Sequence, residues 1–222
     1  MQNFNTLLFD LDGTLVDSAP DIIAALNLTL NDLGHEGVNY HDFRQSAGDG
    51  ARKLLERVLI TKNIPLTDKQ LSTHVDRLLK YYYGIMTNNT TLYPGVSKTL
   101  YTLREAGIKL GICTNRPSPT TKYLLQHFGL TDLFCAVFCP DNVAAKKPDP
   151  RHLQEAMLEL NSSPKTTLMI GDTATDIAAA QNASLKVIAV AYGYSKIPAE
   201  QLGADAVLEH FTELPQLLSS LY

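Results

Sequence analysis

The chain has 222 residues, of which 45% are hydrophobic and 19% charged, which is typical of one globular domain or of a domain with an insert. Its net charge of -4 gives no basic surface for nucleic acid or for an anionic membrane. The N-terminal residues do not resemble a secretory signal peptide, and no apolar run is as long as a membrane span. We therefore expect a cytoplasmic monomer or homodimer with no nucleic-acid or membrane partner.

The three cysteines, Cys113, Cys135 and Cys139, make an odd count without the spacing of a metal site. Cys135 and Cys139 lie among apolar neighbours in "FCAVFCP". We expect all three to be buried, reduced thiols.

Short, almost continuously apolar runs predict the strands of a parallel sheet that is covered on both faces. They lie at residues 6–9, 108–114, 136–139, 166–171, 186–193 and 205–208. Helical patterns at residues 96–107, 119–129 and 174–183 alternate with these strands. This alternation predicts an α/β fold with a Rossmann-like, doubly wound parallel sheet.

A different pattern follows the first strand. Amphipathic helices are predicted at residues 18–34, 50–60 and 67–86, with no strand between them. Ser18 and Asp21 have the spacing of a capping box at the start of the first of these helices. We predict an all-helical cap domain at residues 18–88, inserted into a core domain of residues 1–17 and 89–222.

Polar side chains follow three of the predicted strands at the points where these strands end. They are Asp10 and Asp12 after the first strand, Thr114 and Asn115 after "LGIC", and Asp172 after "LMIG". A parallel sheet brings these strand ends to one edge, where ligands of open α/β sheets bind. Carboxylate oxygens suit Mg²⁺, and the turns that lead into helices suit phosphate. A carboxylate beside a metal can attack phosphorus, and a second carboxylate can move protons.

A positive side chain for such a site is found in "AAKKPDP", which contains Lys146 and Lys147. Pro148 disfavours helical geometry at Lys147, so the next helix should begin beyond it. Alone, a lysine pair is more typical of a solvated loop. Beside the other three stretches, it is predicted to supply a point charge for the nucleophile and the phosphoryl oxygens.

At these residues the chain resembles the haloacid dehalogenase-like superfamily. "DLDGTLVDS" is similar to the first motif of that superfamily, "TN" to the second, "KKPDP" to the third and "GDTATD" to the fourth. The motifs occur in the order typical of the family, and the resemblance extends over essentially the whole chain. It implies a Rossmann-like core with a helical cap inserted after the first motif.

The resemblance also implies a role for each matching side chain. Asp10 corresponds to the nucleophile and Asp12 to the general acid/base. Thr114 corresponds to a phosphoryl-binding residue, and Asn115 assists it. Lys147, directly before the proline, corresponds to the lysine that steadies the negative charge.

The cofactor implied by the resemblance is Mg²⁺. Asp172 would bind it together with Asp10 and the backbone carbonyl of Asp12. Asp176, one helical turn after Asp172, would orient this group of ligands.

Within the superfamily the chain is similar to the phosphoglycolate phosphatases, in stretches such as "TNRPSP" and "AYGYS". This implies a Mg²⁺-dependent phosphatase that hydrolyses a small phosphate monoester, 2-phosphoglycolate, through an aspartyl-phosphate intermediate. A sugar-phosphate mutase such as a β-phosphoglucomutase is one alternative, because it keeps both aspartates and a similar cap. A non-catalytic phosphate-binding module on the same fold is the other, although the intact set of site residues argues against it.

The cap should determine which ester is bound. Its stretch "SAGDGARKLL" contains two glycines followed by Arg52 and Lys53, and this loop could enter the site when the cap closes. Arg52 or Lys53 could then bind a substrate carboxylate. The alternative is an ordinary helix start with solvated basic side chains.

Overall fold

The computed structural model describes residues 4–221; residues 1–3 and 222, at the ends of the predicted core domain, lie outside the described residues. In the described part, six strands form a sheet in the order β5-β4-β1-β6-β7-β8, and all neighbouring strands are parallel. The strands are β1 (Thr6–Phe9), β4 (Lys109–Cys113), β5 (Ala136–Phe138), β6 (Thr167–Gly171), β7 (Lys186–Val190) and β8 (Ala206–Leu208). Each lies within a run that the sequence predicts as a strand.

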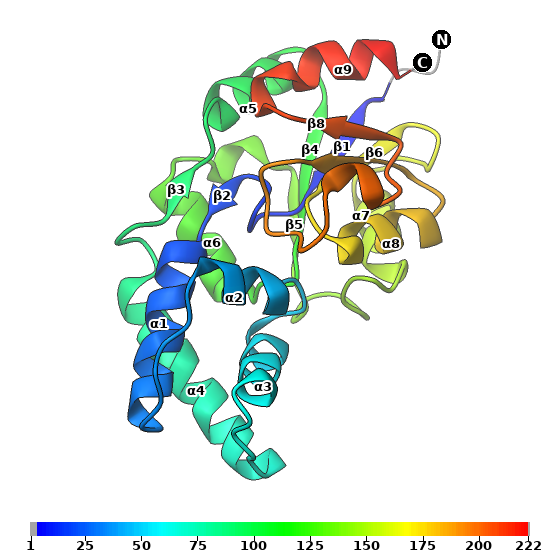
Figure 1. Cartoon of the computed structure of the whole chain (residues 1–222). Coiled ribbons are helices and arrows are strands. Elements are labelled where there is room, and N and C mark those ends of the chain that lie inside the picture. Colours follow the sequence, from blue (N-terminus) through cyan, green and yellow to red (C-terminus); the bar gives the residue numbers. More distant parts are fainter. Residues whose placement is uncertain (1–3, 222) are drawn as a thin grey trace.

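Helices cover both faces of this sheet (Figure 1). Successive residues of a strand point to opposite faces, so Leu7 and Phe9 join one apolar cluster and Leu8 joins another. The first cluster is completed by α5 (Val96–Glu105), α6 (Ser118–His127) and α9 (Leu214–Ser220). The second is completed by α7 (Arg151–Glu159) and α8 (Ala174–Asn182). Short 3-10 helices lie at Thr131–Leu133, Ala199–Gln201 and Phe211–Glu213. The prediction of a doubly wound α/β fold is confirmed.

Four helices between β2 (Val16–Asp17) and β3 (Thr91–Leu92) form a separate layer at one end of the sheet, at the bottom of Figure 1. They are α1 (Ala19–Asp32), α2 (Tyr40–Ser46), α3 (Ala51–Thr61) and α4 (Asp68–Ile85). Their apolar faces form a cluster of their own, which includes Leu26, Leu55 and Leu78. The short helix α2 was not predicted, because seven residues give little helical periodicity. Asn39 begins it with a capping box to Asp42.

The chain passes between the sheet and these helices through an antiparallel ribbon of β2 (Val16–Asp17) and β3 (Thr91–Leu92). The predicted capping box of Ser18 and Asp21 is wrong, since the Ser18 side chain makes no capping bond to α1. The Asp21 carboxylate instead accepts hydrogen bonds from both the backbone and the side chains of Asn89 and Thr90. Asp21 thus ties the two crossing segments together. The boundary of the cap domain at residues 18–88 stays a prediction.

Two further observations concern the surface and the thiols. Among the described helices, none has the length and apolar character needed to cross a membrane. Cys113 and Cys139 are buried free thiols, as expected. Cys135 is exposed, contrary to the prediction, because it lies at the surface just before β5. Its Sγ accepts a hydrogen bond from Arg104 there.

Candidate active site

The ends of three neighbouring strands bring the predicted site residues to one place. Thr114 follows β4, Asp10 follows β1 and Asp172 follows β6. A cavity of about 140 Å³ lies here, between the strand ends and the cap helices. The residues of the core that line it include Asp10, Asp12, Thr114, Asn115, Lys147 and Asp176.

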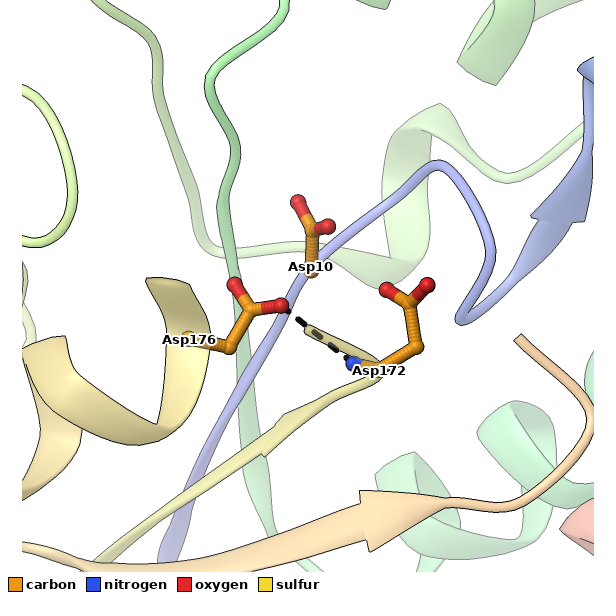
Figure 2. A group of neighbouring side chains, drawn as sticks. All are labelled: Asp10, Asp172 and Asp176. Atoms are coloured by element: carbon orange, nitrogen blue, oxygen red, sulfur yellow. Dashed lines mark hydrogen bonds between the residues drawn. The ribbon is translucent and has the colours of Figure 1, made fainter. Parts of the chain in front are cut away.

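Three buried carboxylates gather at this edge of the sheet. Figure 2 shows Asp10 at the centre, Asp172 at the end of its strand and Asp176 on the first turn of the following helix. One oxygen of each carboxylate lies within 4.8 Å of the other two. Burial and the neighbouring carboxylates raise the pKa of Asp10 to about 7, against the opposing charge of Lys147. Burial, Asp176 and Asp10 likewise raise the pKa of Asp172.

One buried ammonium group lies among these carboxylates. The Nζ of Lys147 is 2.9 Å from Asp10 Oδ1 and 2.5 Å from Asp176 Oδ1. The cluster of three carboxylates therefore carries more negative charge than this single ammonium group can balance. An all-oxygen donor set with excess negative charge fits a hard divalent cation such as Mg²⁺.

Close backbone packing fixes the position of Asp172. A Cβ at Gly13 would lie 2.3 Å from Asp172 Oδ2, and one at Gly193 would lie 2.2 Å from Asp172 Cβ. Gly13 also has a φ of +82°, which other residues rarely adopt. The carboxylate accepts a hydrogen bond from the backbone N–H of Tyr194 at 2.7 Å and one from the Thr14 hydroxyl at 3.2 Å. The "DG" of the first motif is therefore a packing requirement as well as a turn.

Asp176 is held by the start of its own helix. Its Oδ2 accepts hydrogen bonds from the backbone N–H of Thr173 at 3.0 Å and from the Thr173 hydroxyl at 2.7 Å. A weaker bond of 3.3 Å comes from the backbone N–H of Asp172. Its other oxygen accepts from Lys147. Asp176 thus connects Asp172 with the lysine.

A buried histidine positions the backbone of Lys147. The Nδ1 of His152 accepts a hydrogen bond from the Lys147 N–H at 3.2 Å, and its Nε2 lies 3.1 Å from the Phe138 carbonyl oxygen. Burial and the charge of Lys147 lower the pKa of His152 to about 4, so the ring is neutral at pH 7. The Asn115 side-chain amide donates to the Lys147 carbonyl oxygen at 3.1 Å. Sequence reasoning gave His152 no role, because its place in a helix carries no ligand spacing.

Asp12 is paired with an arginine that the sequence analysis did not identify. Arg116 Nε donates to Asp12 Oδ2 at 2.8 Å and Nη2 donates to Oδ1 at 2.5 Å. The Ser18 hydroxyl donates to the same carboxylate. Burial alone would raise the pKa of Asp12, but the charge and hydrogen bonds of Arg116 and the Ser18 bond hold it below the usual value. The position of Arg116 directly after "TN" was the only sequence signal for it.

The structure places Arg52 outside the cavity. Its guanidinium is exposed and pairs with Asp68 and with the Ser72 hydroxyl on α4. The glycines before it, Gly48 and Gly50, do line the cavity, so the loop enters the site while Arg52 turns away. The prediction that Arg52 faces the substrate is therefore corrected: α3 directs its leucines to the cap interior and Arg52 to its outer surface.

The cap contacts the core around the cavity. The Thr175 hydroxyl of α8 donates to Asp49 of the cap loop at 3.1 Å, and Arg57 pairs with the same carboxylate. On the other side, the Phe43 and Tyr194 rings pack edge to face with centroids 5.3 Å apart. These contacts close the cap over the strand ends.

Comparison with known proteins identifies the family to which this chain belongs. A family model for haloacid dehalogenase-like hydrolases matches residues 7–190, and the chain belongs to this family. It is 36% identical to a phosphoglycolate phosphatase of Agrobacterium fabrum over 96% of this chain and 92% of that protein. It is 37% identical to a phosphoglycolate phosphatase of Caulobacter vibrioides, over 99% and 92% of the two chains. The predicted resemblance to phosphoglycolate phosphatases is confirmed, and these relatives support a phosphoric monoester hydrolase.

Solved structures give the same result. A protein described as a predicted phosphoglycolate phosphatase from Haemophilus somnus 129PT superposes with a TM-score of 0.91 at 29% identity, covering 96% of this chain and 97% of that one. CbbY from Rhodobacter sphaeroides, solved in complex with phosphate, has a TM-score of 0.81 at 25% identity, with 95% and 96% coverage. The fold of residues 4–221 is therefore that of this family.

Proposed function

We propose that this protein is a Mg²⁺-dependent phosphatase that hydrolyses a small phosphate monoester, 2-phosphoglycolate, through an aspartyl-phosphate on Asp10. The observation that carries the proposal is the position of Asp10 at the floor of the cavity. It lies 2.9 Å from the Lys147 ammonium and belongs to the cluster of three carboxylates. The names of the relatives support the substrate, and the intact set of motif residues supports catalysis over simple binding.

In the first half of the reaction, a carboxylate oxygen of Asp10 attacks phosphorus, and the bond from phosphorus to the ester oxygen breaks. Asp12, two residues further along, gives a proton to the leaving alkoxide once it is released from the bonds of Arg116 and Ser18 that keep it ionised in the free protein. In the second half, Asp12 takes a proton from a water molecule that attacks the same phosphorus. The bond between phosphorus and Asp10 then breaks, and inorganic phosphate leaves.

The other site residues bind and stabilise. Lys147 offsets negative charge on Asp10 and on the phosphoryl oxygens, and Thr114 and Asn115 contact the phosphoryl group. Asp10, Asp172 and the backbone carbonyl of Asp12 would hold Mg²⁺. When bound, this ion supplies positive charge to the phosphoryl oxygens and lets carboxylate and phosphate approach each other.

The size of the cavity favours a small ester. Its volume is only about 140 Å³, and residues of the cap form part of its wall. Pockets for drug-sized ligands measure roughly 300–1,000 Å³. A two-carbon phosphate ester therefore suits this cavity better than the hexose bisphosphate of a sugar-phosphate mutase. The partner that we propose is accordingly a small phosphorylated metabolite, and a cytoplasmic location stays a prediction.

The proposal is tested by measuring phosphate release from a panel of small esters, with Mg²⁺ and with a chelator. We expect metal-dependent turnover that is fastest on 2-phosphoglycolate and falls by about 10³-fold or more in Asp10→Asn. Asp132→Asn, which changes an exposed aspartate, serves as the matched control. Faster turnover of another ester would change the substrate, and a bisphosphate formed from a hexose phosphate would identify a mutase. A folded, metal-binding protein without turnover would contradict the enzymatic proposal.

A further inference from the structure

Two cationic side chains, Lys147 and Arg116, occur among the described residues that line the cavity. Lys147 forms ion pairs with Asp10 and Asp176, at the position of the proposed phosphoryl chemistry. Arg116 lies on the loop after β4, beside Asp12, and is only 7% exposed. A buried arginine in a cavity this small needs a physical reason, since burying a guanidinium costs free energy unless it is well paired.

Asp12 accounts for only part of the binding capacity of Arg116. A guanidinium carries five N–H groups, and Asp12 uses one on Nε and one on Nη2. The planar group lies over the ring of Tyr82 from α4, with Cζ 5.1 Å from the ring centroid. Stacking of this kind fixes the guanidinium plane. The arginine is therefore held in place for a second planar anion.

Tyr82 positions the guanidinium. Its side chain lines the cavity and is 6% exposed, and its hydroxyl is enclosed beside the Arg116 guanidinium, with which it interacts. The ring therefore holds Arg116 at the cavity wall, where the N–H groups that Asp12 leaves free can contact a ligand.

The position of Arg116 beside Asp12 agrees with recognition of a carboxylate in the substrate. In 2-phosphoglycolate, one methylene group separates the ester oxygen from the carboxylate. Asp12 must reach the ester oxygen to protonate it, and Arg116 already touches Asp12. A carboxylate one carbon away from that oxygen therefore falls beside the guanidinium.

We propose that Arg116, positioned by Tyr82, forms a subsite for the substrate carboxylate, which selects phosphate monoesters with an anionic group one carbon from the ester oxygen. The inference rests on the proposed function and names the residues that give it its specificity. A bound carboxylate competes with Asp12 for the guanidinium, so the correct substrate also releases Asp12 toward the leaving oxygen. An ester without a carboxylate leaves Asp12 paired.

The first test compares kcat/KM for 2-phosphoglycolate with that for ethyl phosphate, which has the same length but no carboxylate. We expect Arg116→Gln to reduce the preference for 2-phosphoglycolate by about 100-fold and Tyr82→Phe by about tenfold, since hydrogen bonds to charged groups are worth this much. Arg77→Gln is the control, because Arg77 is a half-buried arginine that lies outside the cavity, on the same helix as Tyr82, and pairs with Asp32. An equal loss on both esters would show that Arg116 acts only through Asp12 and would overturn the subsite.

The second test does not depend on turnover. Calorimetry in the presence of Mg²⁺ measures binding of 3-phosphonopropionate, in which methylene replaces the ester oxygen, and of propylphosphonate, which lacks the carboxylate. We expect the parent protein to bind the first at least about tenfold more tightly, and Arg116→Gln to bind both alike. Equal binding by the parent overturns the subsite whatever reaction the enzyme performs. Discrimination in binding without turnover of 2-phosphoglycolate would instead refute the proposed function and leave the subsite standing.

A conservative variant shows whether a loss of discrimination arises from the missing guanidinium or from misfolding. Arg116→Lys keeps the positive charge but loses the fork that binds a carboxylate through two parallel bonds. We expect it to fold like the parent by circular dichroism and to lose most of the preference for the carboxylate-bearing ligands. Full discrimination in a folded Arg116→Lys protein would contradict recognition by the guanidinium.

Discussion

Replacing Lys147 by glutamine should destabilise the metal-free protein strongly. The ammonium is 2% exposed and lies 2.9 Å from Asp10 and 2.5 Å from Asp176, so its removal leaves two buried carboxylates without their cation. Removing one partner of a buried ion pair typically costs about 3–5 kcal/mol. Asp10 can relieve part of this cost by taking up a proton, because its pKa is already raised to about 7. The loss should therefore be larger at pH 8, where Asp10 ionises in the parent, than at pH 6.

Added Mg²⁺ should narrow this difference in stability. The ion supplies positive charge to the same carboxylates, and a ligand at one hundred times its Kd stabilises a folded protein by about 2.7 kcal/mol. The free energy of unfolding is measured by urea denaturation of the parent and of Lys147→Gln, at both pH values, with Mg²⁺ and with a chelator. We also expect kcat to fall by about 10²–10³-fold with the metal present, as when a group that stabilises transition-state charge is removed.

The adjacent lysine is a matched control for this experiment. Lys146 is exposed and only reaches the Asp49 carbonyl oxygen of the cap loop at 3.4 Å. Lys146→Gln should change the free energy of unfolding by no more than about 0.5 kcal/mol. Equal stabilities of the two variants in the absence of metal would refute the charge argument for the carboxylate cluster.

Three further predictions concern the cap and its connection to the core. Hydrogen bonds from Asn89 and Thr90 hold the pKa of Asp21 below its usual value despite burial, so the carboxylate stabilises the fold at neutral pH and this contribution is lost as the pH falls. Asp21→Asn should lower the free energy of unfolding by about 1–3 kcal/mol at pH 7, and the gap should close below about pH 4; a gap independent of pH would contradict this. Tyr194→Phe removes a hydroxyl that accepts hydrogen bonds from the backbone N–H groups of Ser18 and Ala19 at the start of α1. It should lower the free energy of unfolding, measured by denaturation, by about 1–2 kcal/mol. The affinity for Mg²⁺ should stay unchanged, because the backbone N–H of Tyr194 and not its hydroxyl holds Asp172. Arg52→Gln should leave the selectivity between 2-phosphoglycolate and ethyl phosphate unchanged, and altered selectivity would restore the original role of Arg52.

The core of the site could be predicted because its chemistry is local to strand ends. Each strand is a short apolar run, and the polar residue that follows must lie at the carboxyl edge of a parallel sheet. This geometry alone brings Asp10, Thr114 and Asp172 together from three distant segments. Lys147 could be assigned to the site only together with these residues, since a lysine pair such as that in "KKPDP" is, on its own, more typical of a solvated loop.

The predictions that were wrong or missing share a different cause, which is that contacts with distant residues override local sequence patterns. Ser18 and Asp21 have the spacing of a capping box, yet Asp12 and the segment at residues 89–90 offer them stronger hydrogen bonds. The strands β2 and β3 have two residues each, which is too short for any periodicity. Arg52 was placed by its distance along the chain from two glycines, but the direction of a side chain on a helix depends on which face packs inward.

The residues that we propose to select the substrate could not be found from the sequence for the same reason. Tyr82 belongs to an amphipathic stripe, and most of that stripe does form the interior of the cap. Only the packing of α4 over the loop after β4 places its side chain at the cavity wall and its ring against Arg116. The chemistry of phosphate therefore lies in motifs of the core, whereas recognition of the rest of the substrate arises where cap and core meet. Substitutions at Tyr82 should accordingly change which ester is chosen while leaving the metal site intact, and a change in Mg²⁺ affinity in Tyr82→Phe would show that the two functions are not separated in this way.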